Sequence, residues 1–166
     1  MIPELGHFAL ILALVLSVAQ SILPLWGAQT NDPRLMALAA PAALIQVALL
    51  AGAFAALTYA FVTSDFSLAV VVANSHTDKP LIYKITGVWG NHEGSLLLWV
   101  MILAGYGAAV AVFGGNLPPR LRARVLSVQG MIGVAFLLFI LLTSNPFWRL
   151  AAPPLNGRDL NPLLQD

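Results

Sequence analysis

The stretch that decides the fold is Trp89-Gly90-Asn91-His92-Glu93-Gly94-Ser95-Leu96-Leu97-Leu98-Trp99, where a polar loop turns into an apolar segment. From 94 to 113 the sequence carries no charged side chain. About twenty apolar residues are the length that a helix needs to cross a bilayer. Asn91 has the side chain and position of a helix N-cap. His92 and Glu93 are therefore expected at the lip of a membrane span, where the helix N-terminus favours an acidic group.

The composition places the chain in a membrane. Hydrophobic residues make up 59% of the 166 residues and charged residues only 9%, whereas soluble domains carry roughly a quarter charged residues. The net charge of +1 and the lack of a long basic block give no indication of a nucleic-acid partner. The chain contains no cysteine, which excludes disulfides and thiol chemistry within it.

The apolar runs predict an all-α integral membrane protein with four transmembrane helices. The expected spans are 5–25, 39–62, 94–113 and 125–143. The first is expected to close at Pro24-Leu25-Trp26-Gly27. Small residues at 105–109, and Gly130 and Gly133 in the fourth span, are expected to let helix backbones approach closely.

Two non-spanning segments complete the predicted organisation. Residues 1–63 hold the first two helices, 64–93 form a long loop ending in the Trp-Gly-x-His-Glu-Gly-Ser motif, 94–143 hold the last two helices, and 144–166 form a Pro-rich tail. Within the loop, 66–73 is apolar but too short to span, so we expect a strand-like or membrane-surface segment there.

The arginines predict the orientation. Short basic loops stay in the cytoplasm, and Arg120, Arg122 and Arg124 form the densest basic cluster in the chain. This places the 114–124 loop and the Arg34 turn inside. Both termini, the long loop and the tail are then expected outside the cytoplasm.

The titratable residues do not form a self-contained catalytic or metal site in the sequence. Of the three histidines, His7, His76 and His92, only His92 has chemically interesting neighbours. Adjacent residues such as His92 and Glu93 do not share a helix face, so they cannot act together as a metal site in the way that i, i+4 ligands do. Two interpretations of the motif remain open: a cap and interfacial anchor for the helix, or a functional surface.

The motifs also resemble a known family. The chain is similar to the N-terminal part of CcmF, the haem lyase subunit family of bacterial cytochrome c maturation, which has a close relative in nitrite reductase maturation. The matching residues are Tyr83-Lys84, Val88-Trp89-Gly90, His92 to Trp99, Pro3 to Gly6, Pro24 to Gly27, Thr143 to Phe147 and Gly157 to Asp166.

The resemblance implies a place in a larger polytopic bundle of the bacterial inner membrane, with functional loops in the periplasm. It implies participation in the covalent attachment of haem to apocytochrome c. It also implies several partners: the C-terminal part of the lyase, a membrane-anchored haem chaperone, and apocytochrome c with its thiol-handling chaperone. The family's haem-ligand histidines lie beyond Asp166, so no haem ligand is assigned here and the chain alone is not expected to hold haem stably. The surface expected to contact haem or a partner comprises Trp89, Gly90, His92, Glu93, Gly94 and Ser95.

Two other functions compete with this one. The chain could be an accessory assembly or scaffold subunit of the same complex, with no haem contact of its own. A small transporter is the third class, and the uncharged spans argue against it. The sequence leaves open whether the chain is a fragment or a split-gene product, and whether it serves cytochrome c or nitrite reductase maturation.

Overall fold

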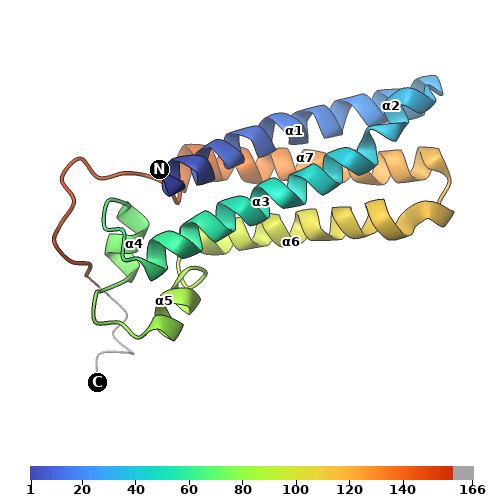
Figure 1. Cartoon of the computed structure of the whole chain (residues 1–166). Helices are drawn as coiled ribbons and strands as arrows, with labels where there is room; N and C mark the ends of the chain where they lie inside the picture. The colour runs from blue at the N-terminus through green and yellow to red at the C-terminus, as the bar shows by residue number, and fades with distance from the viewer. Residues whose placement is uncertain (159–166) are drawn as a thin grey trace.

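The protein is an elongated bundle of four long helices lying side by side (Figure 1). The structure is a computed structural model that describes residues 1–158. Each of the four helices has the length and the apolar composition that a helix needs to cross a membrane. They are α1 (Ile2–Thr30), α3 (Ala39–Val62), α6 (His92–Phe113) and α7 (Pro119–Thr143). The all-helical, four-span architecture is confirmed, and the described residues contain no strand beyond one isolated bridge.

The four helices form a closed ring in which α1 packs on α3 and α7, and α6 packs on the same two neighbours. Small residues make the close contacts, as expected. A methyl group on Gly133 would come within 3.0 Å of Ser17 Oγ, and one on Gly130 within 3.0 Å of Ser21 Oγ. Gly105, by contrast, faces open space. Only about 28–33% of the residues in the apolar part of each span are buried within the bundle. Most side chains of the spans are therefore available to contact lipid or further protein.

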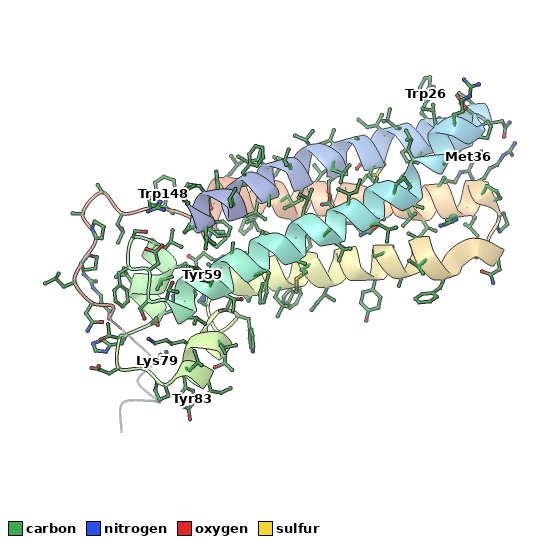
Figure 2. The ribbon with its side chains drawn as sticks, viewed as in Figure 1. Trp26, Met36, Tyr59, Lys79, Tyr83 and Trp148 are labelled. Atoms are coloured by element: carbon green, nitrogen blue, oxygen red, sulfur yellow. The ribbon has the colours of Figure 1, made fainter. Side chains whose placement is uncertain are left out.

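The two ends of the bundle differ in content. One end carries the short helix α2 (Pro33–Ala37), capped by Asp32, whose carboxylate accepts from Arg34 N at 2.8 Å, and the 3-10 turn η1 (Gly114–Asn116). The other carries Met1, α4 (Ala69–Asn74), α5 (Leu81–Gly87) and the start of the tail (Figure 1). Figure 2 shows Trp26 and Met36 at the first end, and Tyr59, Lys79, Tyr83 and Trp148 at the second.

The expected end of the first span is wrong. Helix α1 continues through Pro24 to Thr30, and it ends only where Asn31 adopts the left-handed conformation (φ 61°) and donates its N–H to Gly27 O. Proline removes one helical hydrogen bond. Membrane helices tolerate this because neighbouring groups satisfy the freed carbonyl, and Pro24 is buried in the bundle.

The strand-like expectation for 66–73 is also wrong. Residues from Ala69 form α4, and only Leu68 keeps an isolated antiparallel bridge, to Arg149. Val70, Val71 and Val72 are all buried. Complete burial of such a side chain stabilises by about 1.5–3 kcal/mol. That gain exceeds the helix-propensity deficit of valine, which is less than about 0.7 kcal/mol per residue.

The tail is fastened across the same end of the bundle. Phe147 is buried where its ring fills the space beside Gly6, and Arg149 forms an ion pair with Glu4. Farther along, the Asn156 amide bonds to Thr77 Oγ1 at 2.9 Å. The family-like segment from 159 to 166 lies outside the described residues.

Candidate functional site

The turn before α6 is organised by the side chain of Asn91. Its Oδ1 accepts from Gly94 N at 2.7 Å, and its Nδ2 donates to the carbonyls of Gly87 (2.8 Å) and Val88 (3.1 Å). The first bond is the N-cap that the sequence predicts. The other two fasten the end of α5 to the start of α6, so one amide fixes the direction in which α6 leaves the loop.

Gly94 is required by that geometry. A Cβ on Gly94 would overlap the carbonyl oxygen of Val88, which is the same oxygen that accepts from Asn91. Gly90 is different, because a Cβ there would make only an ordinary contact, 3.6 Å from Thr86 O. Of the two glycines in the motif, only Gly94 is required by close packing.

Trp89 and Ser95 have structural partners. The indole of Trp89 stacks on Phe54 of α3, with ring centroids 6.5 Å apart and planes 18° apart, while 42% of Trp89 stays exposed. Ser95 Oγ donates to the His92 carbonyl at 3.0 Å, within the first turn of α6. These contacts belong to the anchoring interpretation of the motif.

His92 joins two spans. Its Nε2 and Ser144 Oγ share a hydrogen bond of 3.0 Å, and its ring meets Phe139 of α7 edge-on, with ring centroids 6.3 Å apart. The start of α6 is thus tied to the end of α7. Ser144 is buried and gives no periodic signal in the sequence.

Glu93 is the exception in the motif. Among residues 1–158 its half-buried carboxylate makes no hydrogen bond or ion pair. It lines a pocket of about 350 Å³ between α4, the first turn of α6 and the end of α7. The other polar or aromatic lining residues are Asn74, Thr143, Ser144, Asn145 and Trp148, and the rest of the lining is apolar. The free N–H groups at the start of α6 favour a negative charge at this position.

The three histidines do not converge on a common ligand. His7 Nδ1 lies 3.2 Å from Asn145 Nδ2, His92 bonds Ser144, and His76 Nδ1 lies 3.5 Å from Asp78 in the long loop. No group of three histidine, cysteine or acidic side chains gathers within the described part of the chain.

The sequence interpretation missed the contribution of the tail to this site. Ser144, Asn145 and Trp148 form one wall of the Glu93 pocket, although they lie about fifty residues from the motif. In the sequence, the Thr143 to Phe147 segment is recognisable only by its resemblance to the family, and this resemblance is the one available signal.

Comparison with known proteins gives the chain its relatives. Residues 89–166 match the family model described as cytochrome C assembly protein. The whole chain is 70% identical to the cytochrome c-type biogenesis protein ccl1 of Rhodobacter capsulatus and 49% identical to CcmF of Escherichia coli K12. It covers 25% of the first and 26% of the second. A solved structure described as cytochrome c heme lyase CcmF superposes with a TM-score of 0.81 at 28% identity, over 89% of this chain and 25% of that one.

The four spans define a multi-pass helical membrane protein, and its relatives are cytochrome c-type biogenesis proteins. Within that class the chain belongs to the CcmF family, as an N-terminal portion of it. The chain spans about a quarter of the length of the curated relatives that it matches.

Proposed function

We propose that this chain is the N-terminal part of a haem lyase subunit that takes part in the covalent attachment of haem to apocytochrome c. Its relatives are cytochrome c-type biogenesis proteins, and the solved structure that it resembles is described as a haem lyase. The observation within the chain that supports a role beyond anchoring is the Glu93 carboxylate, which lines a pocket and has no partner among residues 1–158.

We further propose that the end bearing α4, α5 and the tail faces the periplasm of the bacterial inner membrane. The opposite end carries Arg34, Arg120, Arg122 and Arg124 against the single acid Asp32, and an excess of basic residues marks the cytoplasmic side. The 64–93 loop and the 144–166 tail then lie on the periplasmic side, where haem attachment takes place.

In this proposal the motif residues have two roles. Asn91, Gly94 and Trp89 fix the position of the first turn of α6, while Glu93 presents its carboxylate to a ligand or partner group in the pocket. A carboxylate that lines an amphipathic pocket suits a cationic or hydrogen-bond-donating group. The candidate partners are the rest of the lyase, the haem chaperone, and the apocytochrome with its thiol-handling chaperone.

The test is Glu93→Gln in the intact lyase, which keeps the shape of the side chain and removes its charge. The helix-dipole contribution of a partly buried carboxylate is at most about 2 kcal/mol, too small to unfold the bundle. The lyase should therefore accumulate normally in the membrane while covalent haem staining of cytochrome c falls.

Asp78→Asn is the matched control, because it removes the same charge from an exposed side chain at the same end of the bundle. Normal haem staining in Glu93→Gln, or a loss that only follows the protein level, would favour the second candidate function, a scaffold with no haem contact. The stacked Trp89 and the hydrogen-bonded His92 are the observations that favour the scaffold.

A further inference from the structure

A polar layer crosses the middle of the apolar bundle. It is built from Ser17, Gln20 and Ser21 on α1, Gln46 on α3, and Ser127 and Gln129 on α7. Gln20 is 1% exposed and Gln46 is 3% exposed. Long amides at such depth in a membrane bundle need protein partners, because the hydrocarbon supplies none.

The three glutamine side chains of this layer each donate a hydrogen bond to a neighbouring helix. Gln46 Nε2 donates to Ser17 Oγ at 2.8 Å, and Gln20 Nε2 donates to Leu126 O at 2.9 Å and to Gln129 Oε1 at 3.1 Å. Gln129 Nε2 donates to Leu103 O of α6 at 3.0 Å. These bonds link all four spans in one layer.

Two acceptors are left over. Gln20 Oε1 and Gln46 Oε1 are buried and accept no hydrogen bond from any described residue. Both residues line the same small cavity, together with Ser17, Leu50, Val100 and Gly133 among others. The cavity leaves about 10 Å³ for the centre of a water molecule, close to the ~10–15 Å³ that one water needs.

We propose that a single water molecule occupies this cavity and donates hydrogen bonds to Gln20 Oε1 and Gln46 Oε1. Water suits the site in either orientation of the Gln46 amide. If the Ser17 hydroxyl instead donates to Gln46 Oε1, the Gln46 Nε2 is left over, and the same water accepts from it. A metal ion fits only the first arrangement.

Charge also selects water over an ion. None of the described charged side chains lines the cavity, so a cation there would be buried without a counter-charge from residues 1–158, which is strongly unfavourable. The site therefore takes a neutral molecule that both donates and accepts, and its volume admits one.

The experiment is a density map of the intact lyase in lipid nanodiscs, at a resolution at which ordered waters are visible. The expected result is one isolated peak within hydrogen-bonding distance of both the Gln20 and Gln46 amides. An empty cavity would overturn the proposal, as would an amide turned away to bond another protein group.

A variant checks that the amides hold the water. Gln46→Met keeps the length of the side chain and removes its polar atoms, so the peak should disappear. Gln29→Met is the matched control, since Gln29 is exposed near the end of α1, and the peak should remain. A peak that persists unchanged in Gln46→Met would contradict the bridging role. If Gln46→Met does not accumulate, Gln20→Met takes its place, and the wild-type map decides in any case.

Discussion

The imidazole of His92, in the first turn of α6, shares a 3.0 Å hydrogen bond with the hydroxyl of Ser144, the residue that follows α7. The two residues are 52 positions apart in the sequence. Their bond closes the bundle at the end that carries the candidate site. A hydrogen bond of this kind contributes about 0.5–1.5 kcal/mol net, so its removal should weaken the bundle without unfolding it.

The first prediction concerns that bond. Ser144→Ala and His92→Ala should each lower the thermal stability of the purified lyase, and the double variant should lose less than the sum of the two. The expected coupling is about 0.5–1.5 kcal/mol. Strictly additive losses would show that the two side chains do not depend on each other.

Gly94 should be the least tolerant residue of the motif. Gly94→Ala places a methyl group on the Val88 carbonyl, and a forced overlap of this kind costs about 1–3 kcal/mol. Membrane accumulation, measured by immunoblot, should fall. Gly105→Ala on the same helix is the control, because its methyl group meets nothing within 4 Å. Equal accumulation of the two variants would contradict the close approach of α5 to α6.

Trp89, the first residue of the motif, and Trp99, in the third turn of α6, should respond differently to substitution. Trp89→Leu removes the stacking on Phe54, worth about 0.5–1.5 kcal/mol beyond the buried area. Trp99 is 66% exposed on the side of α6, so Trp99→Leu should be mild. Thermal unfolding of the two variants in the same detergent measures the difference. A larger loss for Trp99→Leu would mean that the outer face of α6 is covered by further protein.

The orientation of the bundle can be tested by labelling single cysteines in an otherwise cysteine-free intact lyase. A membrane-impermeant maleimide added to spheroplasts should label Asp78→Cys, whose side chain is 90% exposed, and spare Gly115→Cys at the arginine-rich end. Both sites should react after the membrane is opened. The reverse pattern in intact spheroplasts would place the candidate site in the cytoplasm.

The isolated chain should bind haem weakly or not at all. Its three histidines have separate partners, Asn145, Ser144 and Asp78. Absorbance spectroscopy of purified residues 1–166 with added haem provides the measurement. A stoichiometric low-spin spectrum that survives His76→Ala but vanishes in His7→Ala or His92→Ala would refute the prediction.

Several features could be predicted from the sequence because each depends on a local rule. The four spans follow from the length of their apolar runs, and Asn91 follows from the preference of helix N-caps for short polar side chains. The course of α1 past Pro24 could not be predicted in this way, because the surrounding bundle decides whether a proline is tolerated. Likewise the three valines at 70–72 have a local preference for a strand. Their packing against the end of the bundle overrides this preference, and the segment is a helix.

The candidate site could be predicted only in part for a related reason. The motif supplied Glu93 and His92, yet the walls of the pocket come from α4 and the tail. No periodic pattern in the sequence predicts that Asn145 or Trp148 lies beside Glu93. Only the folded chain shows that Trp89 and His92 already have partners, whereas Glu93 has none in the part of the chain that the structure describes.

The adjacent residues Ser144 and Asn145 hold two different helices, the first through His92 of α6 and the second through His7 of α1. The tail is therefore attached at its base to both helices, ahead of the further contacts made by Phe147, Arg149 and Asn156. A partner that draws the tail away from the bundle would pull on His7 of α1 and His92 of α6 together. We therefore expect a movement of the tail to change the shape of the pocket that Glu93 lines, since Ser144 and Asn145 line the same pocket.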